Sequence, residues 1–111
     1  MIDQETIDSI NQLAVAARDR EICGVVDDYL WVHPIKNVAR AGEDFVFSRQ
    51  EYGQVLSRLQ ESGRKILCVY HSHLHNSTSP TPSDLKGMLA CKYDYLIVNG
   101  NTYTYVRCPH E

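Results

Sequence analysis

The chain has 111 residues, of which 43% are hydrophobic and 23% are charged, and its formal net charge is −3. This composition is typical of a folded globular domain and excludes a disordered, collagen-like or repetitive chain. The basic residues are scattered along the sequence, and no apolar run approaches the roughly 18 residues of a membrane span. We therefore expect a single domain over residues 1–111 that binds neither nucleic acid nor a membrane.

The first part of the chain predicts a helix followed by a hairpin. Apolar residues recur at helical spacing over residues 3–18, with polar residues between them. Two β-prone runs, residues 21–26 and 29–33, lie on either side of the pair Asp27 and Asp28. Short strands separated by such turn-forming residues are typical of an antiparallel hairpin.

A second helix is predicted after a loop over residues 37–44 and a short strand over residues 45–47. Ser48 is followed three residues later by Glu51, which is the spacing of a capping box. We therefore expect a helix that begins after Ser48 and ends near Gly63.

The remaining elements alternate between strands and a helix, and an Asn-Gly pair suited to a hairpin turn lies between the last two strands. They are a continuous apolar strand at residues 65–71, a helix at 82–91, and strands at 93–98 and 102–107. A strand without polar alternation is typically buried on both faces. The order of elements predicts the α/β class, as a three-layer αβα sandwich with a mixed sheet between helices.

The four cysteines are widely spaced and contain no C-x-x-C pair, and the N-terminus lacks the pattern of a secretory signal. We expect a cytoplasmic protein with reduced thiols. Cys23 and Cys68 lie in apolar runs and are predicted in the core, whereas a bridge between Cys91 and Cys108 is the alternative for the other two.

A candidate metal site lies at and after the end of the apolar strand. His71 and His73 occupy alternate positions, so they project from the same face and can bind one ion. Asp84 falls in the first turn of the predicted helix, where the helix dipole favours an ionised carboxylate. The position eleven residues after His73 is Asp84, whereas the position eleven residues after His75 is Lys86, so His71 and His73 are the preferred ligands.

This spacing resembles the signature of the JAMM/MPN metalloprotease family. That signature is a glutamate on an early strand, the pair H-x-H, a serine eight positions after the second histidine, and an aspartate three positions further on. The corresponding residues of this chain are Glu21, His71, His73, Thr81 and Asp84. The resemblance implies a cytidine-deaminase-like αβα fold, one zinc ion held by the two histidines and Asp84, and catalytic roles for Glu21 and Thr81.

The resemblance extends over about residues 5–107 and is strongest to small bacterial and phage members, such as the amino-terminal module of tail-tip assembly proteins from lambda-like phages. Two residues depart from the family pattern. Leu74 replaces the usual proline after the second histidine, and Thr81 replaces the usual serine, keeping its hydroxyl group. His75 is an additional imidazole that binds substrate, serves as an alternative ligand, or is merely solvated; the last is preferred.

Structural roles are the alternatives for the same residues. Thr81 and Asp84 have the spacing of a helix cap, in which the carboxylate would point at the backbone and away from a metal. Glu21 can equally be a surface charge at the start of a strand. His33 and His110 are predicted to be exposed loop histidines without a role.

The resemblance implies a zinc-dependent metallopeptidase or isopeptidase in which the ion activates water, Glu21 acts as general base and Thr81 stabilises the oxyanion. Its substrate would be a protein or peptide: a ubiquitin-like C-terminal tail, a phage tail protein or a peptidoglycan peptide. Its location would be the bacterial cytoplasm, the host cytoplasm or a virion. The alternative is a non-catalytic binding or assembly module, for example in phage tails. A nucleobase deaminase is excluded because its H-x-E and P-C-x-x-C motifs are absent.

Overall fold

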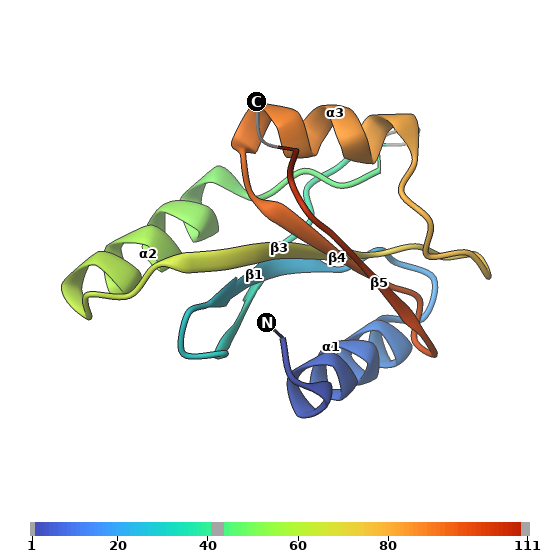
Figure 1. Ribbon diagram of the computed structural model, residues 1–111, viewed down its shortest axis with the longest axis horizontal. Helices are drawn as coiled ribbons and strands as arrows, with labels where there is room; N and C mark the ends of the chain where they lie inside the picture. Colours follow the sequence, from blue (N-terminus) through green and yellow to red (C-terminus); the bar gives the residue numbers. More distant parts are fainter. Residues whose placement is uncertain (1, 41–43, 110–111) are drawn as a thin grey trace.

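The structure is a computed structural model that describes residues 2–40 and 44–109. Its elements are α1 (Gln4–Ala17), β1 (Cys23–Asp27), β2 (Val32–Ile35), α2 (Arg49–Glu61), β3 (Ile66–Ser72), α3 (Pro82–Cys91), β4 (Asp94–Val98) and β5 (Tyr103–Val106). The strands form a sheet in the order β2-β1-β3-β4-β5, in which β3 and β4 run parallel and the other neighbours antiparallel. Figure 1 shows α1 on one face of the sheet and α2 and α3 on the other. The predicted αβα sandwich is confirmed.

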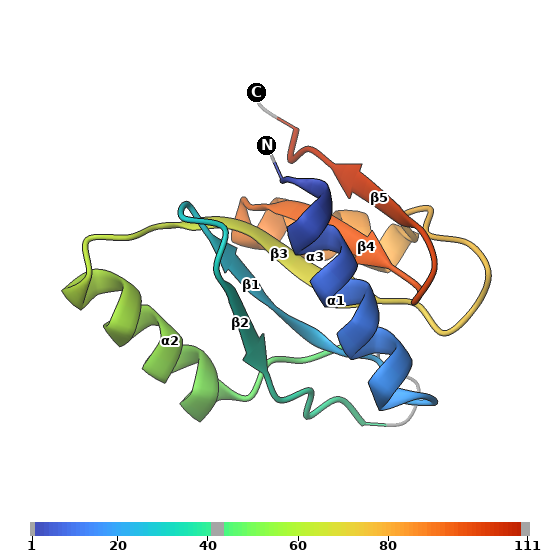
Figure 2. The ribbon, with the colours of Figure 1, turned by 90° about the horizontal axis from the view of Figure 1, so that it is seen from below.

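The central strand β3 separates two apolar layers. Cys68 and Tyr70 belong to the apolar layer between the sheet and α1, and Figure 2 shows α1 in front of the sheet. Val69 belongs to the layer between the sheet and the helices α2 and α3. Because successive side chains alternate between faces, His71 lies on the same side as Val69. The predicted strand at residues 65–71 is therefore confirmed as one that is buried on both faces.

The helix starts follow from short polar side chains. Asp3 Oδ1 accepts the backbone N–H of Thr6 at 3.0 Å and begins α1, and Ser48 accepts the N–H of Glu51 at 3.2 Å and begins α2. The prediction that Glu51 completes a capping box at the start of α2 is wrong. Glu51 Oε1 instead accepts the N–H of Lys36 at 2.7 Å, because the chain entering α2 already pairs with Lys36 through Ser48.

Two predicted details of the loops are also corrected. Residues 45–47 form no strand of their own but a single bridge between Asn37 and Phe47, because the Asn37 carboxamide accepts the N–H of Val46 in place of a neighbouring strand. The β4–β5 hairpin turns through four residues, 99–102, and Asn99 Oδ1 accepts the N–H groups of Asn101 and Thr102.

The β4–β5 turn is attached to α1 by a buried side chain. Asn11 Oδ1 accepts the N–H of Gly100 at 2.8 Å, and Asn11 Nδ2 donates to the carbonyl of Thr102 at 3.4 Å. The first helix and the last hairpin are thereby joined by hydrogen bonds as well as by apolar packing.

His33 is not the exposed loop residue that was predicted from the proline after it. It lies in β2, where its Nε2 contacts Asp27 Oδ2 at 2.8 Å. The Asp27 side chain is fully buried, and its other oxygen accepts the N–H groups of Tyr29 and Trp31. The hairpin therefore brings His33 to a buried carboxylate. His110 lies outside the described residues.

All four cysteines are free, so the alternative of a bridge between Cys91 and Cys108 is not observed. Cys91 is exposed, whereas Cys23, Cys68 and Cys108 are buried, and burial raises the pKa of the Cys23 and Cys68 thiols to about 12. None of the described helices is long and apolar enough to cross a membrane.

Candidate metal centre

The two histidines are placed by the end of β3. His71 is the penultimate residue of the strand and is completely buried, and His73 follows the strand directly and is 5% exposed. The N–H of His73 donates to the carbonyl of Val98 at 2.8 Å, which continues the parallel pairing with β4 beyond the end of the strand. The backbone of both histidines is thus held by pairing with β4.

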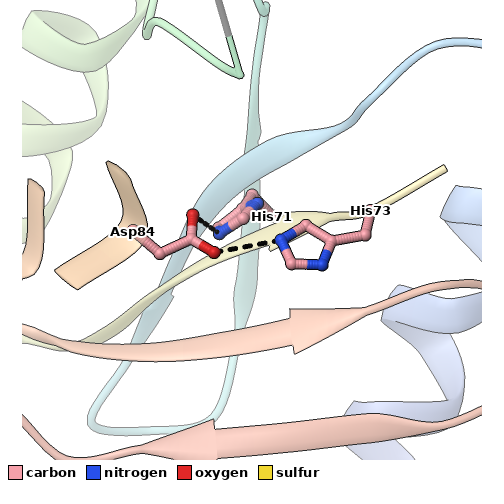
Figure 3. A group of neighbouring side chains, drawn as sticks. All are labelled: His71, His73 and Asp84. Carbon is pink, nitrogen blue, oxygen red and sulfur yellow. Dashed lines mark hydrogen bonds and ion pairs between the residues drawn. The ribbon is translucent and has the colours of Figure 1, made fainter. Parts of the chain in front are cut away.

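Asp84 approaches the histidines from the first turn of α3. Its Oδ1 lies 3.0 Å from His71 Nε2, and its Oδ2 lies 3.0 Å from His73 Nε2 (Figure 3). The ligand atoms of these three buried residues all lie within 4.8 Å of one another. Among the described residues, this group includes neither Glu21 nor His75.

The same carboxylate closes the cap of α3. Asp84 Oδ2 accepts the N–H of Thr81 at 2.9 Å, and Thr81 Oγ1 accepts the N–H of Asp84 at 3.0 Å. The expectation that a capping aspartate would point away from a metal is therefore wrong. One carboxylate reaches both the helix end and the histidines, because its two oxygens lie on the side of the capping turn that faces β3.

Burial alone would raise the pKa of Asp84. The interaction with His71, the N–H of Thr81 and the contact with His73 outweigh burial and hold this pKa well below its usual range. Asp84 is therefore ionised at neutral pH, which is the state required of a metal ligand.

A neutral His73 would face the carboxylate with a lone pair. Its Nδ1 lies 3.0 Å from the carbonyl oxygen of Ser77. Because a carbonyl oxygen can only accept a hydrogen bond, the hydrogen of a neutral ring is assigned to Nδ1. Nε2 of the neutral ring then points a lone pair at Asp84 Oδ2, which also only accepts. A cation between these two atoms, a proton or a metal ion, satisfies both of them.

His71 gives an independent indication of a bound cation. Its Nε2 is close to Asp84 Oδ1 but lacks the alignment of a hydrogen bond, so neither ring nitrogen has a hydrogen-bond partner among the described residues. A buried polar atom without a partner costs free energy. The donor set of two imidazoles and one carboxylate suits a divalent ion such as zinc, and such an ion would satisfy the orphaned Nε2.

Glu21 lies just before β1 and is electrostatically coupled to this group. Burial, together with the charges of Asp44 and Asp84, raises the pKa of Glu21 to about 7, against the opposing effect of His73. Its Oε1 is buried and has no hydrogen-bond partner among the described residues. Glu21 is therefore a carboxylate poised to exchange a proton near neutral pH.

Two side chains that the sequence analysis missed hold the Glu21 segment in place. Ser72 accepts the N–H of Ile22 at 2.9 Å through Oγ and donates its own N–H to the Ile22 carbonyl at 3.0 Å, while Asn37 Nδ2 donates to the Glu21 carbonyl at 3.0 Å. A signal for Ser72 was present, since it is a hydroxyl residue between the two histidines in an apolar strand.

His75 is exposed and stacks on His73, with ring centroids 4.8 Å apart. Its carbonyl and that of Asn76 accept hydrogen bonds from Asn99 Nδ2, at 3.4 Å and 2.9 Å. The exposure agrees with the preferred interpretation of a solvated side chain. The loop after His73 is thus pinned to the β4–β5 turn by Asn99, another residue that the sequence analysis missed.

Similarity to a known family extends over nearly the whole chain. The family described as prokaryotic homologs of the JAB domain matches residues 3–108. No curated protein matches the chain.

Two solution structures share the fold. A protein of Desulfitobacterium hafniense is 20% identical with a TM-score of 0.73, over 94% of this chain and 79% of that protein. A protein of Salinibacter ruber is 22% identical with a TM-score of 0.60, over 95% of this chain and 80% of that protein. Since the family match spans nearly all of the sequence, the JAMM/MPN resemblance is confirmed, and the chain belongs to the prokaryotic homologs of the JAB domain.

Proposed function

We propose that the protein is a zinc-dependent metallopeptidase or isopeptidase that hydrolyses a peptide or isopeptide bond. His71, His73 and Asp84 would hold one zinc ion through the atoms that converge in Figure 3. When bound, the ion supplies a Lewis acid that activates water and polarises the scissile carbonyl. Two imidazoles and a carboxylate leave a coordination position open, which is typical of a hydrolytic site rather than a structural one.

The observation that carries this proposal is the state of Glu21. Its buried Oε1 has no hydrogen-bond partner among the described residues, and its pKa is raised to about 7. Glu21 would accept a proton from the attacking water and deliver it to the leaving amine. Thr81 Oγ1 accepts the N–H of Asp84, so its own hydrogen stays free to be donated to the oxyanion.

A binding or assembly module without catalysis, for example in phage tails, is the second candidate. Leu74 supports it, because the side chain that replaces the usual proline is 55% exposed beside the site. An unpaired, half-buried glutamate has no use in a scaffold, so the enzyme is preferred. The proposed substrates are a ubiquitin-like C-terminal tail, a phage tail protein or a peptidoglycan peptide, encountered in the cytoplasm or in a virion.

The decisive experiment measures metal content and turnover together. Wild-type protein, Glu21→Gln and His73→Ala are purified, supplied with zinc, and analysed for metal and for cleavage of a peptide and isopeptide library. We expect one zinc in wild type and in Glu21→Gln, none in His73→Ala, and turnover in wild type alone. Full activity of Glu21→Gln would contradict the mechanism. Absence of bound zinc in wild type would favour the assembly module.

A further inference from the structure

A cavity of about 640 Å³ lies between α3, strands β3 and β4 and the segment that leads into α2. Five rings line it, and we call it the aromatic pocket: Phe45, Phe47, Tyr52, Tyr93 and Tyr95. A concave site of this size, lined by apolar and aromatic groups with a few polar atoms, is typical of ligand recognition.

The aromatic pocket shares its wall with the candidate metal centre. Asp84 itself lines the cavity. The Phe45 ring stacks on the His71 ring with centroids 4.4 Å apart, and Tyr95 contacts the same imidazole edge-on at 5.5 Å. A group bound in the pocket therefore lies directly beside the metal ligands.

A second cavity, of about 530 Å³, is lined by Glu21 and Leu74, and it contains none of the three candidate ligands. Asp44 lines both cavities, so they meet at this residue. A bond to be cleaved has a residue on each side. One cavity lined by the candidate ligand Asp84 and another lined by Glu21 leave room for a residue on each side of such a bond.

The chemistry of the aromatic pocket selects its occupant. Its rings offer apolar contact surface, and its charged groups are the carboxylates of Asp44 and Asp84 at the metal end. An apolar side chain gains from burial against the rings, whereas an acidic side chain would lose hydration there, would meet no cationic side chain among the residues that line the cavity, and would face the Asp44 carboxylate.

We propose that the aromatic pocket binds an apolar aromatic or branched side chain of the substrate residue next to the scissile bond, and that it rejects aspartate and glutamate there. This inference rests on the proposed function, because it assigns one side of the substrate of the same centre.

Cys91 provides a means of filling the aromatic pocket from within. It lines the cavity near the end of α3 and is the exposed thiol of the four. Alkylation by N-phenylmaleimide therefore places a phenyl ring in the pocket, and Cys91→Trp does so genetically. Leu89→Trp is the matched control, because Leu89 lies on the same helix, is 54% exposed and does not line the cavity.

The first test measures binding without turnover. N-acetyl-phenylalaninamide, N-acetyl-glycinamide and N-acetyl-aspartamide are titrated into zinc-loaded Glu21→Gln protein, and backbone amide shifts are followed by NMR. We expect the phenylalanine probe alone to shift the amides of Gly87, Tyr93 and Tyr95, and this response to disappear in Cys91→Trp but not in Leu89→Trp. Equal responses to the aspartate and phenylalanine probes would overturn the inference.

The second test measures selectivity of turnover with peptides that differ at one residue on either side of the cleaved bond. We expect phenylalanine or leucine to exceed glycine in kcat/KM by about tenfold or more on one side, and aspartate to fall below glycine. The ratio should fall towards one in Cys91→Trp and after alkylation of wild type, whereas Cys91→Ser treated with the same reagent should show no response to it.

The two hypotheses fail in different ways. Binding of the phenylalanine probe without hydrolysis of any peptide would contradict the proposed function and support the pocket. Hydrolysis with no preference on either side would contradict the pocket and support the proposed function.

Discussion

His73 Nε2 and Asp84 Oδ2 face each other at 3.0 Å, although the hydrogen bond of His73 to Ser77 leaves no hydrogen between them on a neutral ring. The same oxygen accepts the N–H of Thr81 at the start of α3. Helix capping and cation binding therefore use one carboxylate, and substitutions can separate the two.

Asp84→Asn should lose the metal but keep much of the cap. The carboxamide oxygen can still accept the N–H of Thr81, whereas the charge that attracts the ion is removed. We expect zinc affinity to fall at least 100-fold, measured by competition with a chelator. Thr81→Ala should do the reverse, lowering the free energy of unfolding by about 1 kcal/mol while keeping bound zinc. Tight zinc binding by Asp84→Asn would contradict the ligand assignment.

Glu21→Gln should stabilise the metal-free protein at alkaline pH. The pKa of Glu21 in the folded chain is about 7, above its ordinary value of 4.5, so its ionisation costs stability as the pH rises between these values. At pH 8 we expect the variant to be more stable by about 1–2 kcal/mol, a figure reduced for the solvent access of a half-buried group. At pH 4 the two proteins should unfold at the same urea concentration. A constant difference at both pH values would show that the effect is steric.

Asp27→Asn should destabilise the end of the sheet that lies opposite the candidate metal centre. Burial would raise the pKa of Asp27, but the hydrogen bonds from His33, Trp31 and Tyr29 outweigh it and lower the pKa. The stabilising contribution is thus present above the pKa of the unfolded chain and is lost as the pH falls through the folded pKa. We expect a loss of roughly 2–3 kcal/mol at pH 7 and a smaller loss at pH 3, measured by urea unfolding. The exposed Asp19→Asn is the control and should change neither value.

Asn99→Asp should loosen the loop after His73 without removing the β4–β5 turn. The carboxylate still accepts the N–H groups of Asn101 and Thr102, but it cannot donate to the carbonyls of His75 and Asn76. We expect zinc to bind about tenfold more weakly, with little change in melting temperature. The exposed Asn101→Asp adds the same charge without breaking these bonds, so it should keep the wild-type affinity.

The features that could be predicted from sequence depend on short separations along the chain. The caps at Asp3, Ser48 and Thr81 act over three residues, and His71 and His73 share a face because of strand alternation. The local signals were therefore sufficient for the helices, the αβα fold class and the ligand cluster.

The features that were missed depend on distant residues meeting in space. Ser72 holds the Glu21 segment across 50 positions, and Phe45 stacks on His71 from a loop that sequence alone predicts to be a strand. His33 was misplaced because the adjacent proline suggested a loop, whereas an edge strand tolerates proline and brings His33 to buried Asp27. Such contacts follow from topology, which local patterns do not specify.

The attachment of Asn11 to the β4–β5 turn has a consequence for substitutions far from the metal centre. The three candidate ligands lie within one short stretch of sequence, but His73 is held through the carbonyl of Val98 and its loop through Asn99. The turn that carries these groups docks on α1 through Asn11. Asn11→Ala would therefore loosen the support of the centre from the opposite face of the sheet, although α1 contributes no candidate ligand.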